Sequence, residues 1–400
     1  MIVYCENIIF TMQSQNFRSH PSIIYQCLFI SWVDQYAPEN HATRASTSAL
    51  SKLLHYHACD PIKANANSRE VLAHQSEFVA NSIFMPIPKK CGAGSLANRR
   101  TYTSDWHNAL KLGFDVKELA YPQWLLALLT EVGIGTDVLP EVVEPGKIIG
   151  PISSSAAHEY GFGEDTKLVG GTTDSNAAFI AAVAGAGSSP KFGVAVTSLG
   201  STLAMKMLSR TFVEDSKTGV YSHRFPVFGS SGDSESDSDA DAGEAWLVGG
   251  ASNVGCKVLR GEKFSNEELV TLSKDIDIAT DSPYEYYPLT KVGERFPIAD
   301  ATKEPILEPK PGSRVEYLKG ILQGISNVER MGFEIMGELG ASPSTPEEIW
   351  TAGGGAKNDT WLKMRERLLR NSFDSDKITV RKADNAEASF GAAVLAASSF

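Results

Sequence analysis

The chain has 400 residues, a hydrophobic content of 42% and a formal net charge of -11 at pH 7. This length suggests roughly two to three domains of about 150 residues each, with enough apolar side chains for two cores. Six acidic residues lie in one short tract: Asp233, Glu235, Asp237, Asp239, Asp241 and Glu244. The rest of the chain has no basic face, which argues against nucleic acid as a partner.

The cysteines and the apolar runs limit the cellular compartments in which the protein is expected. The five cysteines are odd in number and widely spaced, which argues against a disulfide framework or a zinc site and favours a reducing compartment. The longest apolar runs, 23–33 and 121–129, are too short to span a bilayer. Residues 1–35 lack a basic segment followed by a small-residue cleavage site, so we expect neither secretion nor a membrane partner.

The first third of the chain has few clear patterns. Residues 1–35 show no periodicity and cannot be assigned to an element. Three leucines on one helical face predict a helix over 45–57. Residues 81–100 combine Pro and Gly with Lys and Arg, which is typical of a loop insertion. Apolar residues at helical spacing near 124–129 then predict another helix.

A glycine-rich turn follows in the segment Leu168-Val-Gly-Gly-Thr-Thr-Asp-Ser, which predicts a strand, a turn and a helix from Asn176. Asp174 stands at the start of that helix, where an aspartate commonly serves as an N-cap. The same carboxylate would also suit a general base that accepts a proton from a substrate hydroxyl during phosphoryl transfer. The residues leave both interpretations open.

Residues 193–207 alternate as a β-hairpin. Its tip, Gly200-Ser201-Thr202, offers hydroxyls and backbone N–H groups to phosphate oxygens, although a plain β-turn has the same composition. The acidic segment 226–245 has too little apolar surface to fold alone. It is also a poor EF-hand loop, because Ala242 stands where glycine is needed.

The last third of the chain is the most regular. Residues 246–253 predict another strand and turn, and 316–339 predict a long amphipathic helix that ends before Gly340. A final helix is predicted from Asn385 through Leu395.

Between these two helices, an apolar strand leads into Gly353-Gly354-Gly355 and Asn358. Such a turn directs backbone N–H groups and a helix N-terminus towards a bound anion, as in a nucleotide phosphate site. It is not a P-loop, and the third glycine of a dinucleotide-binding fingerprint is missing. A tight structural turn remains the alternative.

The order of these motifs carries a resemblance. Gly-Thr-Thr-Asp-Ser at 171–175, Thr-Ser-Leu-Gly-Ser-Thr at 197–202, Trp-Leu-Val-Gly-Gly-Ala-Ser-Asn at 246–253 and Ala-Gly-Gly-Gly-Ala-Lys-Asn-Asp at 352–359 together resemble the FGGY carbohydrate kinases. The chain is most similar to the plant and cyanobacterial xylulose-kinase-like branch assigned to D-ribulose phosphorylation. Three further segments match that branch: 104–115, 286–289 and 293–300.

The resemblance implies an α/β fold with the two-domain architecture of the actin/hexokinase/Hsp70-like (ribonuclease H-like) ATPases, with ATP and sugar bound between the domains. It places a sugar-binding N-terminal domain at 36–190, with the insertion 81–100. A nucleotide-binding C-terminal domain follows at 191–400, with the acidic loop 226–245.

The implied activity is an ATP- and Mg2+-dependent transfer of phosphate to a pentulose such as D-ribulose or D-xylulose. Carried over by position, Asp174 resembles the catalytic base and, with Ser175, the sugar-binding segment. The residues that resemble the nucleotide-binding set are Gly200, Ser201, Thr202, Gly353, Gly354, Gly355 and Asn358. A cytoplasmic or plastid location fits this branch, and the oligomeric state is not determined by the sequence.

One family motif is missing. Members of the family open with an Asp-x-Gly-Thr/Ser turn that holds magnesium and the γ-phosphate, and residues 1–35 contain no such motif. We therefore expect an incomplete N-terminal domain and an impaired sugar kinase. The alternatives are a nucleotide-binding pseudoenzyme that phosphorylates no sugar, and an actin-like ATPase with a protein client.

Overall fold

The computed structural model describes residues 33–39, 41–44, 48–59, 72–80, 84, 102–185, 187, 190–226 and 244–398. The predictions for most of 1–35, 81–100 and 226–245 fall outside these residues. The chain divides into two compact units. Unit 1 comprises Met1–Ala177 and Ala392–Phe400, and unit 2 comprises Ala178–Gly391. The division falls within a helix, before the expected boundary at 190.

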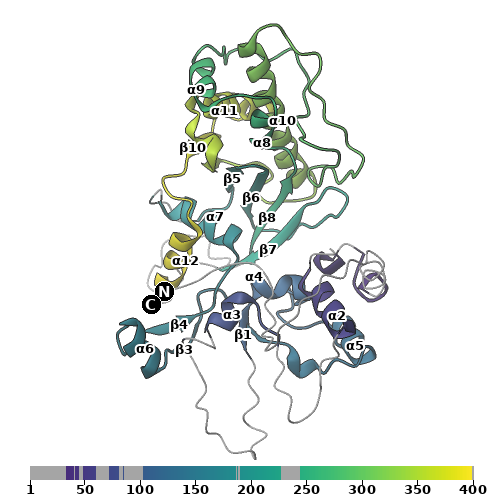
Figure 1. The fold of residues 1–400 in the computed structure, drawn as a ribbon, viewed down its shortest axis with the longest axis vertical. Helices are drawn as coiled ribbons and strands as arrows, with labels where there is room; N and C mark the ends of the chain where they lie inside the picture. Colours follow the sequence, from purple (N-terminus) through teal and green to yellow (C-terminus); the bar gives the residue numbers. More distant parts are fainter. Residues whose placement is uncertain are drawn as a thin grey trace, which may run out of the picture. The chain divides into compact units, whose positions relative to one another are not determined.

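Unit 1 consists of short helices and two small sheets (Figure 1). Its helices and 3-10 turns are η1 (Ala42–Arg44), α2 (Ala49–Cys59), α3 (Gln75–Val79), α4 (Trp106–Ala109), η4 (Leu110–Leu112), α5 (Gln123–Glu131), η5 (Thr136–Val138) and α6 (Ser154–Tyr160). Strand β1 (Thr103–Asp105) pairs in parallel with β2 (Glu141–Val143), and β3 (Ile148–Pro151) pairs antiparallel with β4 (Lys167–Val169).

The main core of unit 1 lies between α2 and α5. Leu50, Leu53 and Leu54 of α2 are buried against leucines of α5. These leucines recur every three or four residues, so each helix places an apolar stripe on one face. Both helices predicted from that spacing are confirmed.

Two helices contain residues of both units: α7 (Asp174–Gly185) and α12 (Ala388–Ala397). The predicted final helix begins three residues later than expected. The Asn385 side chain accepts a hydrogen bond from the Glu387 N–H at 2.8 Å, which forms a local turn in place of the first helical residues.

Unit 2 is built on a six-stranded sheet with the order β10-β9-β5-β6-β8-β7 (Figure 1). Its strands are β5 (Val194–Leu199), β6 (Leu203–Ser209), β7 (Tyr221–Phe225), β8 (Ala245–Ser252), β9 (Glu348–Ala352) and β10 (Thr379–Lys382). Strands β5, β9 and β10 are mutually parallel, whereas β6 is antiparallel to both β5 and β8. The β5–β6 pair confirms the predicted hairpin.

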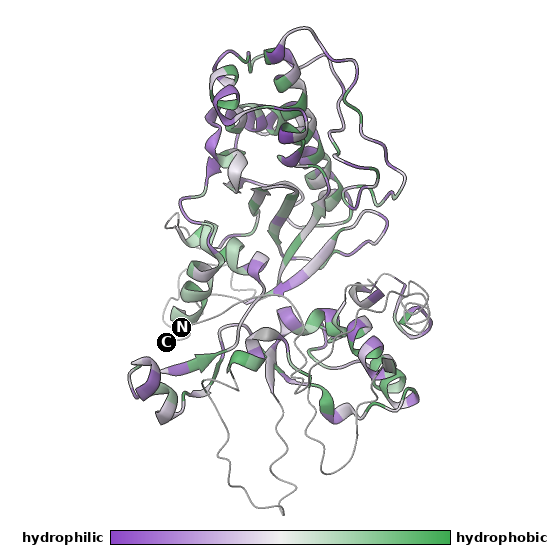
Figure 2. Ribbon diagram, viewed as in Figure 1, coloured by the Kyte–Doolittle hydropathy of each residue, from purple (hydrophilic) through white to green (hydrophobic). Residues whose placement is uncertain are grey.

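Five helical segments belong to unit 2: α8 (Lys257–Gly261), α9 (Asn266–Lys274), α10 (Arg314–Glu338), η6 (Gly354–Lys357) and α11 (Asp359–Phe373). The long predicted helix is confirmed as α10, which begins after its N-cap Ser313 and ends before Gly340, where φ is +102°. Strands β5 and β6 are buried along almost their whole length. Their residues are mostly hydrophobic and appear predominantly green in Figure 2, which is typical of strands in a sheet covered on both faces. Among the helices of the described segments, none has the length and apolarity needed to cross a membrane.

A buried ion pair connects the helices of unit 2 to its sheet. Glu329 of α10 and Arg365 of α11 are both 0% exposed. Arg365 donates from Nε and Nη2 to the two Glu329 oxygens, each at 2.6 Å, and from Nη1 to the Thr351 hydroxyl at 2.7 Å. Thr197 of β5 donates to Glu329 at 2.6 Å. The charges are therefore paired and hydrogen-bonded, as burial requires.

Removing one partner of this pair should leave the other charge buried in the core without an opposite charge. We expect Arg365→Leu or Glu329→Leu to lower the free energy of unfolding by about 3–5 kcal/mol, measured by urea denaturation. The half-exposed Arg330→Ala should cost less than about 1 kcal/mol. A loss equally small for Arg365→Leu would show that the buried pair contributes little to the stability of the sheet.

Candidate functional site

Three turns meet at one edge of the sheet in unit 2. Strand β9 is parallel to β5, and β8 is antiparallel to β6, which is itself antiparallel to β5. The carboxyl ends of β5, β8 and β9 therefore lie on the same edge. They lead into the hairpin tip 200–202, the turn 253–256 and the turn 353–358.

The first two turns are joined by backbone contacts. Gly200 accepts a hydrogen bond from the Cys256 N–H at 2.8 Å, and Leu203 donates to Val254 at 2.7 Å. A methyl group at Gly255 would lie 2.5 Å from the Thr202 Cα, so the backbones approach too closely for any side chain there. The hairpin tip is consequently fixed, although the Ser201 and Thr202 side chains are exposed.

Burial also determines the protonation state of Cys256, whose N–H makes this contact. It raises the pKa of the Cys256 thiol to about 11. The thiol is therefore neutral at physiological pH and serves as a small packing group rather than as a nucleophile.

The three glycines of the third turn have different roles. Gly353 has φ of +82°, and a methyl group there would lie 2.7 Å from the Leu199 carbonyl oxygen. Gly355 is buried, and a methyl group would lie 2.7 Å from both Leu199 and Trp361. Nothing lies within 4 Å of the corresponding position at Gly354, which is exposed. Only Gly354 thus keeps open space for a ligand, whereas Gly353 and Gly355 permit the turn to pack on β5.

Asn358 supports this turn with its side chain. It is the N-cap of α11 and accepts from the Trp361 N–H at 3.1 Å, while its amide nitrogen donates to Ser273 at 2.8 Å. The short 3-10 segment η6 begins at Gly354, within the glycine run, and leads through Asn358 into α11. Exposed hydroxyls, an open glycine and turn N–H groups at one sheet edge are suited to binding phosphate oxygens.

Asp174 lies in unit 1, as the first residue of α7. Its Oδ1 accepts from the adjacent Ser175 N–H at 2.5 Å, whereas an N-cap would accept from an N–H two or three residues further on. The carboxylate is half-buried and Ser175 is exposed. The structure thus shows no N-cap hydrogen bond to Asp174 from an N–H two or three residues on, and its role as a proton acceptor stays a prediction.

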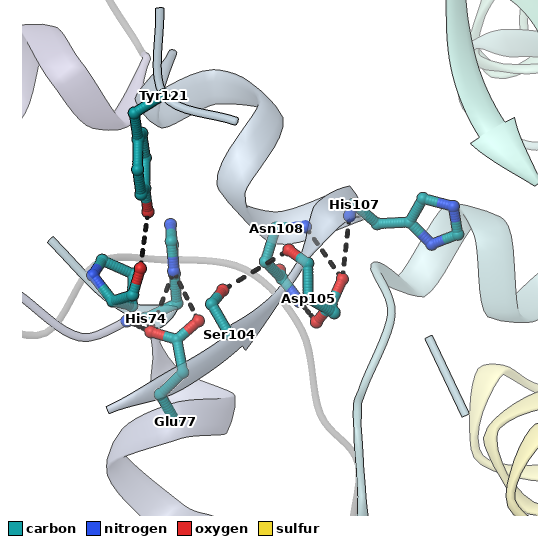
Figure 3. Close-up of polar contacts among 8 residues, drawn as sticks. His74, Glu77, Ser104, Asp105, His107, Asn108 and Tyr121 are labelled. Atoms are coloured by element: carbon teal, nitrogen blue, oxygen red, sulfur yellow. Dashed lines mark hydrogen bonds and ion pairs between the residues drawn. The ribbon is translucent and has the colours of Figure 1, made fainter. Parts of the chain in front are cut away.

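Unit 1 also contains a buried polar cluster that the sequence motifs do not predict (Figure 3). Asp105 caps α4 and accepts from the N–H groups of His107 and Asn108 and from the Asn108 amide at 2.6 Å. Nearby, His74 Nδ1 lies 2.7 Å from Glu77 Oε1. The motif Ser-Asp-Trp-His-Asn at 104–108 is the sequence feature that contains Asp105, but nothing in the motif predicts that this aspartate is buried.

Burial changes the titration of this cluster. It raises the pKa of Asp105 to about 6, although the hydrogen bonds from Asn108 oppose the shift. Burial by itself would lower the pKa of His74, but the Glu77 carboxylate and its hydrogen bond outweigh burial and raise that pKa. Both groups therefore bind protons more tightly in the folded chain than in the unfolded chain.

The described residues hold no group of three or more His, Cys, Asp or Glu side chains arranged to bind a metal ion. A magnesium ion that accompanies a nucleotide is held largely by phosphates and water, with one or two carboxylates. Such an ion does not require a cluster of this kind.

Comparison with known proteins identifies the fold. No protein-family model matches the chain. The chain is 30% identical over 280 residues to the xylulose kinase of Bacillus subtilis (strain 168). The aligned residues cover 69% of this chain and 50% of that relative. The chain thus spans half the length of this curated relative.

Solved structures are similar over most of the chain. A xyloylose kinase from Brucella ovis is 16% identical with a TM-score of 0.67, covering 94% of this chain and 69% of that one. Plasmodium falciparum glycerol kinase with ADP is 15% identical with a TM-score of 0.69 and the same coverage. These likenesses confirm the predicted actin/hexokinase-like ATPase fold, and together with the xylulose kinase match they support the resemblance to carbohydrate kinases.

The polar cluster of unit 1 should make stability depend on pH. Because the folded pKa of Asp105 lies above its ordinary value of 3.8, its contribution is present at low pH and is lost as pH rises to about 6. That loss amounts to about 3 kcal/mol. His74 acts in the same direction, since its raised pKa stabilises the fold below 6.5 and the gain disappears as pH rises through the folded value.

We therefore expect the free energy of unfolding, measured by urea denaturation, to fall between pH 4 and pH 7. Asp105→Asn should flatten this slope while keeping an N-cap side chain. The exposed Asp165→Asn should leave the slope unchanged. A steep slope in Asp105→Asn would assign the pH dependence to other groups.

Proposed function

We propose that this chain is an ATP-dependent carbohydrate kinase of the FGGY family that phosphorylates a pentulose, with D-ribulose or D-xylulose as acceptor. The observation that carries the proposal is the convergence of the turns after β5, β8 and β9 at one sheet edge of unit 2. The similarity to the xylulose kinase of Bacillus subtilis supports a sugar as the acceptor. The expected location is the cytoplasm or a plastid.

The nucleotide is assigned to unit 2. The exposed hydroxyls of Ser201 and Thr202 and the N–H groups of the hairpin tip would bind phosphate oxygens, and the open face at Gly354 would admit the adenosine. The glycerol kinase of similar fold was solved with ADP, which supports a nucleotide as the ligand. Asn358 and Gly355 would hold this surface in place rather than contact the base, because their atoms are used in packing and capping.

The sugar is assigned to unit 1, with Asp174 as the general base and Ser175 beside it. As a hydroxyl oxygen of the sugar forms its bond to the γ-phosphorus, the bond from that phosphorus to the bridging oxygen of ADP breaks. The Asp174 carboxylate accepts the hydroxyl proton. When bound with ATP, Mg2+ would neutralise charge on the phosphates.

A second candidate is a nucleotide-binding protein that phosphorylates no sugar. It is favoured by the fact that every residue assigned to the nucleotide lies in unit 2, apart in sequence from Asp174. ATP binding by calorimetry without sugar-dependent ADP release would support this candidate over the kinase.

Replacing Asp174 tests the proposed base. We expect Asp174→Asn to lower kcat by about two to four orders of magnitude, because the amide cannot accept the proton. ATP affinity should not change, since the nucleotide residues lie in unit 2. Sugar-dependent ADP release with D-ribulose and D-xylulose is the measurement, and Asp165→Asn is the matched control. Near-normal turnover in Asp174→Asn would remove this residue from the mechanism.

Replacing Gly354 tests the nucleotide surface. Gly354→Val places a branched side chain in open space, so the fold should survive while ATP affinity falls about tenfold or more, in line with an interaction of about 1.4 kcal/mol. Calorimetry measures the affinity, and thermal denaturation checks the fold. Gly312→Val is the control, because that glycine also has open space around it. Unchanged affinity in a folded Gly354→Val protein would contradict the assignment.

Gly355→Val should behave differently from Gly354→Val. The valine side chain would clash with Leu199 and Trp361, so we expect Gly355→Val to lower the stability of the fold. Any loss of ATP affinity in this variant would then reflect the loss of stability. An unaltered melting temperature in Gly355→Val would show that the turn can move off β5.

A further inference from the structure

The turn that leads into Asp174 is held at two points. The first is Gly170, which accepts from the Gly146 N–H at 2.9 Å and donates to Lys147 at 2.8 Å. A methyl group at Gly170 would lie 2.6 Å from the Glu144 carbonyl oxygen. The backbone at this first point has no room to shift towards the segment after β2.

The second point is Thr172. Its hydroxyl lies 2.7 Å from Nδ1 of His107, and the two side chains are 1% and 2% exposed. The contact joins residues 65 positions apart and connects α4 to the turn. Which atom donates depends on the imidazole tautomer, but either way the contact fixes the side chain two residues before Asp174.

His107 is itself anchored to the small parallel sheet. Its N–H donates to Asp105 Oδ1 at 2.9 Å, and Asp105 pairs with Val143 across β1 and β2. A methyl group at Gly170 would lie 3.1 Å from Val143 Cγ2, so the first anchor rests on the same sheet. The turn thus contacts the same two-stranded sheet, β1–β2, at both points.

We propose that His107 is a positioning residue for Asp174, which acts through Thr172 to hold the Gly-Thr-Thr turn in one conformation. The proposal rests on the proposed role of Asp174 as general base. A buried hydrogen bond of this kind restricts the turn, and a displacement of about 1 Å at a reacting group can cost about 100-fold in rate. Support by neighbouring residues is what holds such a group in a productive orientation.

Two substitutions of His107 separate the hydrogen bond from the volume of the ring. His107→Leu fills space without a polar atom, whereas the amide nitrogen of His107→Asn can lie close to the original Nδ1. We expect His107→Leu to lower kcat about 10- to 100-fold in ADP release with D-ribulose and D-xylulose, and His107→Asn to recover most of that loss. The KM for ATP should not change in either variant.

Substitutions of Thr172 test the same bond from its other end. Thr172→Val should reproduce the fall in kcat, and Thr172→Ser should not, because serine keeps the hydroxyl. The double variant His107→Leu/Thr172→Val should be no slower than either single variant, because each substitution removes the same hydrogen bond. If His107→Leu does not fold, this Thr172 pair decides the question. His158→Leu, on the exposed face of α6, is the control.

A readout without turnover separates this proposal from the proposed function. The Ser175 N–H donates to Asp174, so its amide resonance in 15N-labelled protein reports the orientation of the carboxylate. It should shift in His107→Leu and Thr172→Val but not in His158→Leu. A wild-type chain with no sugar-dependent ADP release would refute the kinase assignment, whereas the Ser175 test would stand.

Three results would overturn the positioning role. An unchanged kcat with an unshifted Ser175 resonance in folded His107→Leu and Thr172→Val would do so. A fall in kcat that neither His107→Asn nor Thr172→Ser avoids would also do so. A rise in the KM for ATP matching the fall in kcat would indicate a general structural effect instead.

Discussion

The buried ion pair between Glu329 and Arg365 is the interaction on which the rest of unit 2 depends. It sits between two helices and reaches two adjacent strands through Thr351 and Thr197. Charged groups without water must satisfy every donor and acceptor they bring, so their geometry is restricted far more than that of apolar neighbours. The pair therefore fixes α10 and α11 against β9 and β5.

That constraint extends to the sheet edge. The turn at 353–358 lies between β9 and α11, and both are held by the ion pair. Further along, the Trp361 indole donates to the Leu322 carbonyl at 3.1 Å and to Ser326 at 2.9 Å, which ties the start of α11 to α10. Asn358 adds a bond to α9. The open surface at Gly354 is thus supported from beneath by polar contacts that leave it little freedom to move.

Two buried carboxylates, Glu329 in unit 2 and Asp105 in unit 1, have different partners. In unit 2 the opposite charges meet directly, with two hydrogen bonds between them. In unit 1 Asp105 is satisfied mainly by neutral amide and N–H groups, so burial dominates and its pKa rises. The ion pair holds a sheet in place, whereas the titrating cluster supports the strand from which His107 and the turn before Asp174 are anchored.

The sequence by itself determined the elements that form from local patterns. The hairpin of β5 and β6, the long helix α10 and the leucine stripe of α2 follow from side-chain spacing within a few residues, so they could be predicted. Motif order was enough to predict the ATPase fold and to select the three turns. Those predictions required no knowledge of which distant residues meet.

Only the tertiary structure shows the features that depend on contacts between residues far apart in the sequence. Three adjacent glycines look alike in sequence, but only the approach of Leu199 shows that Gly354 alone faces open space. The pairing of Glu329 with Arg365 and of His107 with Thr172 joins residues 36 and 65 positions apart, and no local pattern specifies either contact. The raised pKa of Asp105 follows from burial, which is a property of the folded chain rather than of the motif that contains it.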